Sequence, residues 1–254
     1  MAAREARLAS EARTRAAAAT RRRWRALAAA LAAATGVAVL AVGISSGSGS
    51  TAAAPGGRLT GAAFSATLFA GIPQHGLVLG RPDAPLRMVE FADLQCPYCD
   101  EYALQALPTL VRDYVRTGEL SLRFENLSFI GPDSVAAGRA AAAAARQNRL
   151  WNFVDLMYLN QGQENTGYVT AGYLRGLLSA VPGLNVAAAL RASRAPSAQA
   201  ALTEASAYAT SVGVAATPSF LIGTRAGALR VFQPSTLTPA PFTAALGALL
   251  KEVR

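Results

Sequence analysis

Two cysteines separated by two residues constrain this chain more than any other feature. Cys96 and Cys99, in the sequence CPYC, are its only cysteines. A disulfide between them would close a loop too short to join distant parts of a fold, so we do not expect it to serve stability. A zinc site needs about four nitrogen or sulfur ligands, and the only histidine is His75, which we expect in a structural or surface position. The pair therefore indicates redox chemistry and no metal site.

The cysteines lie between a predicted strand and a predicted helix. Residues 86–92 (LRMVEFA) form a short apolar run rich in strand-forming side chains, directly after the turn signal RPDAP at 81–85. After the cysteines, apolar side chains recur every three or four residues, which is typical of a helix, up to Gly118. These side chains are Leu104, Leu107, Leu110, Val111 and Tyr114.

This order places Cys96 at the N-terminus of the helix, with Pro97 at the first helical position, where its missing N–H has no cost. The positive end of the helix dipole and the free backbone N–H groups favour a thiolate there. We therefore expect Cys96 to be the exposed nucleophile, with a pKa below the free value of about 8.5. Cys99, one turn further along, is expected to be the buried resolving thiol.

With these motifs in view, the sequence resembles a known family. The segment VEFADLQCPYCDEY, with GIPQHGLVLGRPDAPL before it, resembles the DsbA-like branch of the thioredoxin superfamily, in particular its membrane-anchored or secreted bacterial members. The resemblance continues through FENLSFIGPDSVAAGRAAAAAARQNRLWNFVDLMYLNQGQENTGYVT and reaches ATPSFLIG, and so covers roughly residues 71–223. It implies an α/β thioredoxin fold with an inserted α-helical domain, which we place at about 134–211.

The pattern of residues 134–211 is consistent with that insertion, because no strand-like alternation occurs there. A stripe with helical spacing is formed by Leu150, Phe153, Val154, Met157 and Tyr158, and another by Tyr173, Leu174, Leu177 and Leu178. We interpret QGQEN at 161–165 as a loop. Beyond the insertion we expect strands at 219–222 and 229–232. A closing helix is expected at 239–253, with Phe242, Leu246, Leu249 and Leu250 facing inward.

The resemblance also implies a substrate-binding loop at Thr217 and Pro218. The local pattern alone predicts a trans turn entering a strand, since few X-Pro bonds are cis. In the family this proline is cis and packs beside the cysteine pair, so Thr217 would offer its backbone to an extended substrate segment. Pro97 and Tyr98, between the two cysteines, would complete this substrate-binding surface.

A third candidate catalytic residue is Glu90, six residues before Cys96. It matches by position the acidic residue buried under the cysteine pair in DsbA-like oxidases, whose basic partner would fall at or near Arg123. A buried carboxyl would have a raised pKa and could take the proton of Cys99 during exchange. In the alternative interpretation, Glu90 is exposed at a strand end or ion-paired. Asp93 and Gln95 are expected to be surface residues of the turn.

Charge is concentrated at the N-terminus. The chain has 24 Lys and Arg against 15 Asp and Glu, and eight arginines lie within residues 1–25. The rest of the chain holds sixteen basic and thirteen acidic residues, a balance of +3. That balance is too small for a nucleic-acid footprint, so no nucleic-acid partner is expected.

An uncharged, apolar run of nineteen residues follows, which begins at Ala26 and ends at Ile44. As a helix with about 1.5 Å rise per residue it would be roughly 28 Å long, close to the thickness of a bilayer core. We predict a basic cytoplasmic head (1–25), a transmembrane signal anchor (26–44), a flexible linker (45–57) and an extracytoplasmic catalytic domain (58–254) on the cell membrane. The alternative is a cleaved secretory signal, with a small-residue site near Ala54.

The function predicted from these features is thiol–disulfide exchange on exported proteins outside the cytoplasm. The expected activity is that of a dithiol oxidase that introduces disulfides through Cys96 and Cys99, with this redox-active disulfide in place of any cofactor. The resemblance implies unfolded or reduced exported proteins as substrates, and a membrane reoxidant of the DsbB or vitamin-K-epoxide-reductase type. Two alternatives are a disulfide reductase or isomerase, including one for cytochrome c maturation, and a non-catalytic tethered peptide-binding module.

Overall fold

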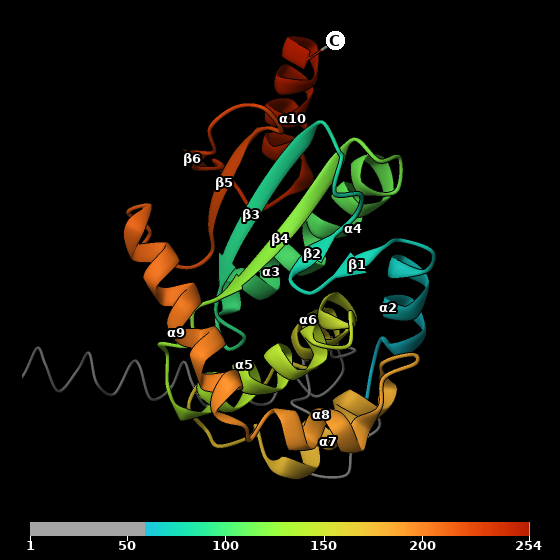
Figure 1. Ribbon diagram of the computed structural model, residues 1–254, viewed down its shortest axis with the longest axis vertical. Coiled ribbons are helices and arrows are strands. Elements are labelled where there is room, and N and C mark those ends of the chain that lie inside the picture. Colours follow the sequence, from blue (N-terminus) through green and yellow to red (C-terminus); the bar gives the residue numbers. More distant parts are fainter. Residues whose placement is uncertain (1–58, 254) are drawn as a thin grey trace, which may run out of the picture. The chain divides into compact units, whose positions relative to one another are not determined.

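The structure is a computed structural model that describes residues 59–253 (Figure 1). The predicted cytoplasmic head, transmembrane anchor and linker lie outside the described residues. Within the described range, no helix combines the length and the apolar character needed to cross a bilayer.

A six-stranded mixed sheet organises the described part of the chain, in the order β1-β2-β4-β3-β5-β6. Strand β3 (Leu86–Ala92) has the bounds predicted from the sequence and lies inside the sheet, parallel to β4 and antiparallel to β5. Both faces of β3 are largely buried, which explains its continuous apolar character. The other strands are β1 (Gln74–His75), β2 (Val78–Leu79), β4 (Leu120–Asn126), β5 (Ser219–Thr224) and β6 (Arg230–Phe232).

Only helices occur between β4 and β5, which confirms the predicted helical insertion. Figure 1 shows α5 to α8 gathered beyond one end of the sheet, with α9 leading back to β5. The stripe predicted on residues 150–158 is buried throughout α6, and the two leucines of the second stripe, Leu177 and Leu178, are buried in α7. The five helices are α5 (Pro132–Ala145), α6 (Leu150–Leu159), α7 (Ala171–Ala180), α8 (Val186–Ala192) and α9 (Pro196–Ser211).

Two more helices lie near the ends of the described range. Helix α10 (Pro239–Val253) has the predicted bounds, and the four side chains expected to face inward are all buried. Helix α2 (Ala62–Phe69) precedes the sheet and packs on α6, with Ser65 and Phe69 buried.

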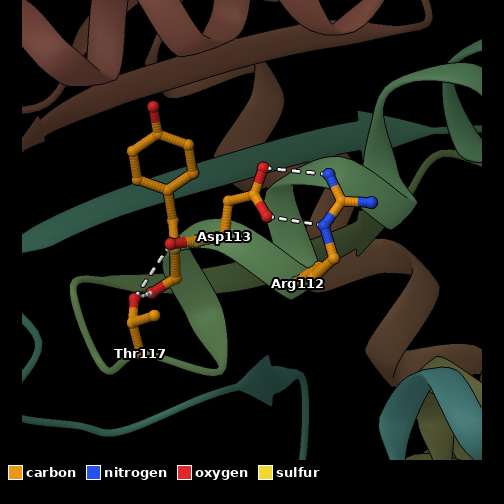
Figure 2. Close-up of polar contacts among 4 residues, drawn as sticks. Arg112, Asp113 and Thr117 are labelled. Atoms are coloured by element: carbon orange, nitrogen blue, oxygen red, sulfur yellow. Dashed lines mark hydrogen bonds and ion pairs between the residues drawn. The ribbon is translucent and has the colours of Figure 1, made fainter.

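The helix predicted from the cysteines to Gly118 is divided into three pieces: α3 (Pro97–Gln105), α4 (Leu107–Leu110) and the π-helical turn η1 (Val111–Val115). The break lies beside Pro108, which has no N–H to continue the hydrogen-bond ladder. After η1 the Thr117 hydroxyl donates to the carbonyls of Asp113 and Tyr114, at 3.0 Å each. Figure 2 shows this arrangement, together with the exposed ion pair between Arg112 and Asp113.

The two faces of the sheet carry different side chains, because neighbouring residues of a strand point to opposite sides. On one face, Val89 and Phe91 pack with α9. On the other face, Met88 and Phe124 belong to the main core, together with Tyr102 of α3. The redox motif therefore begins at the end of a strand that is fixed on both sides.

Candidate active site at the dithiol turn

Cys96 is the N-cap residue of α3, and Pro97 follows at the start of the helix, as predicted. The backbone N–H of Cys96 donates to the carbonyl of Asp93 at 3.0 Å, which closes the turn between strand and helix. Cys96 is 5% exposed and Cys99 is fully buried. The prediction of an exposed Cys96 is therefore wrong. Its Sγ lies 3.5 Å from the carbonyl oxygen of Thr217, so the loop from the far end of the chain covers it.

The two thiols have opposite electrostatic surroundings. The pKa of Cys96 is lowered to about 6 because its thiolate accepts hydrogen bonds from the Cys99 thiol, the Thr217 side chain and nearby backbone amides. The pKa of Cys99 is raised well above its ordinary value, mainly by burial and further by the neighbouring Cys96 and Glu90. Cys96 is thus a thiolate at neutral pH and Cys99 a thiol, the asymmetry expected from a helix N-terminus.

The peptide bond between Thr217 and Pro218 is cis. The trans bond predicted from the local sequence pattern is therefore wrong, and the cis bond implied by the family resemblance is confirmed. Between the cysteines, Pro97 is exposed and Tyr98 is 63% exposed, so both are accessible beside the covered sulfur. Their contact with a substrate stays a prediction.

Glu90 is buried beneath the cysteine pair, which excludes the alternative that it is exposed at a strand end. Burial raises its pKa to about 8. Its charge acts on Cys99 and on the phenols of Tyr102 and Tyr158. Its Oε1 atom has no hydrogen-bond partner among the described residues. A carboxyl in this state can hold or release a proton near neutral pH.

The expected basic partner of Glu90 is absent from this position, so that prediction is wrong. In the parallel ladder, Glu90 lies opposite Phe124, whereas Arg123 lies opposite Val89 and so belongs to the other face of the sheet. There the Arg123 guanidinium pairs with the carboxylate of Glu125.

Replacement of Glu90 with Gln is expected to stabilise the protein at neutral pH. A raised folded-state pKa means that stability is fully present below the unfolded value of 4.5 and is lost as the pH rises towards 8. Glu90→Gln has no carboxyl to ionise and avoids this loss. Its free energy of unfolding should therefore exceed that of the wild type by about 3 kcal/mol at pH 7. Urea unfolding of the reduced wild type and variant at pH 4.5, 6, 7 and 8 measures this difference in stability. Glu252→Gln, at an exposed position, is the control. Parallel pH profiles for wild type and Glu90→Gln would contradict the buried, protonated carboxyl.

Asp93 and Gln95 are fully buried, although we expected them at the surface. The Asp93 carboxylate accepts hydrogen bonds from the backbone N–H groups of Gln95 (2.9 Å), Phe129 and Ile130 (3.0 Å each) and from the hydroxyl of Ser134 (2.6 Å). Apart from Gln95, which belongs to the dithiol turn itself, these donors lie in the loop after β4 and at the start of α5. The carboxylate is buried because it satisfies amides that would otherwise lack an acceptor.

The loop QGQEN at 161–165 holds the same turn from the opposite side. The Gln161 side-chain amide donates to the carbonyls of Leu94 (3.2 Å) and Cys96 (3.3 Å), and the backbone N–H of Asn165 donates to the Gln95 side chain at 2.9 Å. The insertion therefore fixes the backbone on which Cys96 stands. Spacing alone gave no signal for these contacts, because their partners are more than 60 residues apart.

Replacement of Asp93 with Ala is expected to lower the free energy of unfolding by about 4 kcal/mol, because it leaves buried donors without an acceptor. Asp113→Ala is a matched control: it removes a carboxylate from an exposed ion pair (Figure 2), so we expect little change. Urea denaturation followed by circular dichroism compares the two variants. Similar midpoints would show that Asp93 does not hold the turn.

Two other features of the described residues lie apart from the dithiol turn. No three His, Cys, Asp or Glu side chains between residues 59 and 253 are grouped so that they could hold a metal ion. A cavity of about 520 Å³ is lined by Arg87, Ser121 and Arg123, among others, on the face of the sheet opposite Glu90.

Comparison with known proteins agrees with this geometry. Residues 73–230 match the family model described as Thioredoxin. The chain is similar to the probable disulfide bond formation protein D of Bacillus cereus, with 35% identity over 102 residues, which cover 39% of this chain and 47% of the relative. The chain thus spans about half the length of the curated relatives it matches.

Two solved structures have a similar fold. One is oxidised BdbD from Bacillus subtilis, with a TM-score of 0.61, 21% identity and coverage of 71% of this chain and 97% of that chain. The other is alpha-DsbA1 from Wolbachia pipientis, with a TM-score of 0.61, 18% identity and coverage of 72% and 92%. These likenesses support the thioredoxin-like α/β fold with its added helices.

Proposed function

Because the chain belongs to the thioredoxin family, whose model matches residues 73–230, we propose that it is a DsbA-like thiol–disulfide oxidoreductase that introduces disulfides into other proteins. One observation carries this proposal. A low-pKa Cys96 at a helix N-terminus lies against Thr217, beside a cis proline, with the high-pKa Cys99 buried behind it.

In the proposed reaction the enzyme begins with a Cys96–Cys99 disulfide. A substrate thiolate attacks Sγ of Cys96, the Cys96–Cys99 bond breaks, and Cys99 leaves with the electron pair and takes up a proton. A second substrate thiolate then attacks the substrate sulfur of the mixed disulfide, and Cys96 leaves as a thiolate. The substrate loses two electrons and two protons, and the enzyme pair gains the electrons.

The surroundings of the two sulfurs fit these steps. Cys96 is a good leaving group because its thiolate is stabilised, which is the property of a leaving thiol with a low pKa. Cys99 must be protonated when it leaves, and Glu90, with a pKa of about 8 beside it, can deliver and recover that proton. A stabilised thiolate also favours the reduced enzyme, which makes the disulfide an oxidant.

The reduction potential of the Cys96–Cys99 pair in the purified full-length chain tests this function. Equilibration in glutathione buffers is expected to give a value nearer to about −120 mV than to about −270 mV, the values typical of an oxidant and a reductant. The oxidised protein should also form a disulfide in a reduced dithiol peptide, and Cys96→Ser should not. A potential near the lower value would replace the oxidase with a reductase.

We extend the proposal to the membrane. The uncharged run from Ala26 to Ile44 behind an arginine-rich head supports a single-pass anchor with the catalytic domain outside the cytoplasm, where reduced exported proteins are the substrates. Reoxidation then requires a membrane partner of the DsbB or vitamin-K-epoxide-reductase type that passes the two electrons to a quinone. A reporter active only outside the cytoplasm, fused after Arg254, should be active and membrane-bound. Recovery of the intact chain from the cytosol would contradict this topology.

A further inference from the structure

A groove of about 580 Å³ lies between helix α9 and the loop that follows β4. One wall contains Leu127 and Phe129, and the other contains one side of α9. Val214 and Ala215, directly before the cis-proline loop, lie at its end. We call this feature the α9 groove.

The side chains that line the α9 groove carry no charge, although the Arg139 guanidinium donates to the side-chain oxygen of Gln199 at one end. The helical wall presents Gln199, Thr203, Ser206 and Thr210, whose spacing of four, three and four residues puts them on one side of α9. The hydroxyls of Thr203 and Thr210 donate to carbonyls one turn earlier, so their oxygen lone pairs stay available as acceptors. No Asp, Glu, Lys or Arg lines the groove. The surface is suited to an uncharged polypeptide segment.

Phe129 adds an apolar contact at the rim. Its side chain is 57% exposed. Its position is fixed all the same, because its backbone N–H donates to the buried Asp93 carboxylate at 3.0 Å. The groove wall and the redox turn are therefore held by the same side chain.

The groove is continuous with the redox site along the backbone. Ala215 lines the groove, and Thr217, two residues later, places its carbonyl oxygen 3.5 Å from Sγ of Cys96. Ala215 and Ala216 are exposed. Among the described residues, no hydrogen bond engages the backbone N–H of Ala215, Ala216 or Thr217. A strand-like segment can therefore pair with this edge and continue into the groove.

We propose that the α9 groove binds an extended, uncharged segment of the substrate that flanks its reacting cysteine. This inference rests on the proposed function and adds the part of the substrate that is recognised. From Thr210 to Gln199 the helical wall extends about 16 Å, which is the length of about five residues in an extended chain. Two or three further substrate residues would lie opposite Ala215 to Thr217. Together with the five in the groove, the recognised segment of the substrate has about eight residues.

The test compares dithiol peptides oxidised by the full-length protein. One peptide has no extension, and two others carry an eight-residue arm of Ser, Thr and Val on the N-terminal or the C-terminal side of the cysteines. At concentrations below saturation, one of the two armed peptides is expected to react about tenfold faster than the peptide without an arm. In Ser206→Arg, which places a long cation in the middle of the groove, the ratio of armed to unarmed rates should fall to about one.

Ser197→Arg is the matched control, because Ser197 is exposed on the same helix but nine residues away, on the opposite side. It should keep the tenfold ratio. The inference is overturned if neither arm accelerates the wild type, or if Ser206→Arg keeps the ratio. It is also overturned if the wild type is a dimer that Ser206→Arg dissociates, since the groove would then bind a second copy. Failure to oxidise even the unarmed peptide would instead refute the proposed function itself.

Discussion

Replacing Cys99 with Ala is expected to turn the reduced protein into a covalent trap for single-cysteine peptides activated as mixed disulfides with thionitrobenzoate. The Cys96 thiolate attacks the peptide sulfur, thionitrobenzoate leaves, and a Cys96–peptide disulfide forms. In the wild type, Cys99 then attacks Sγ of Cys96 and releases the peptide thiol. Without Cys99 this intramolecular step is lost, so the adduct should persist on the order of 100-fold longer.

Absorbance of the released thionitrobenzoate gives the first step, and mass spectrometry of the quenched protein gives the adduct. Cys96→Ala is the control. Its remaining thiol, Cys99, is fully buried and has a raised pKa, so the variant should neither release thionitrobenzoate nor form a peptide adduct. Rapid peptide release from Cys99→Ala, or an adduct on Cys99 in the wild type, would show that the two thiols have been assigned the wrong roles.

The cysteine pair and its two flanking elements could be predicted because their signals are local. A run of strand-forming residues, a proline after Cys96 and a helical spacing after Cys99 lie within about thirty residues. The predicted bounds of β3 and α10 are those of the structure. Strand β4 also carried a local signal, since Leu120, Leu122 and Phe124 alternate with polar residues. In contrast, β1 and β2 have two residues each, too few for any alternation to appear.

The errors share a different cause, which is dependence on distant segments. Asp93 and Gln95 have the composition of a surface turn, and only the loop after β4 and the QGQEN loop, folded back over them, bury both side chains. The supposed partner of Glu90 depended on register, because a shift of one residue in β4 moves Arg123 to the other face of the sheet. Neither effect is encoded by neighbouring residues.

A second large effect is expected in the pH dependence of stability when the reduced and oxidised proteins are compared. The pKa of Cys96 falls from 9.0 to about 6 on folding, but only in the reduced form. A depressed folded-state pKa adds stability that is fully present above the unfolded value and is lost as the pH falls through the folded value. Allowing for solvent screening, the reduced form should gain about 3 kcal/mol relative to the oxidised form between pH 6 and 9.

This gain opposes the stabilisation that the disulfide provides by restricting the unfolded chain, which is about 2 kcal/mol for a loop of this length. The reduced protein should therefore be the more stable form at pH 9, and its advantage over the oxidised protein should shrink as the pH falls towards 6. Glu90 is buried in the reduced form, and we expect the disulfide to leave it buried, so its contribution to the difference should largely cancel. Cys99, whose pKa is raised, adds an opposite slope only above pH 9.0.

Thermal unfolding of both redox forms from pH 5 to 9 measures the difference, at about 2 to 4 °C for each kcal/mol. The gain in stability of the reduced form between pH 6 and 9 comes from the Cys96 thiolate, so the Cys96→Ser variant should not show this gain. The variant should still lose stability with rising pH through Glu90, as both forms of the wild type do. A constant difference between the two forms from pH 6 to 9 would mean that folding does not stabilise the thiolate. The disulfide would then be as stable as an ordinary structural bridge, and an enzyme with such a disulfide would keep it and could not pass it to a substrate.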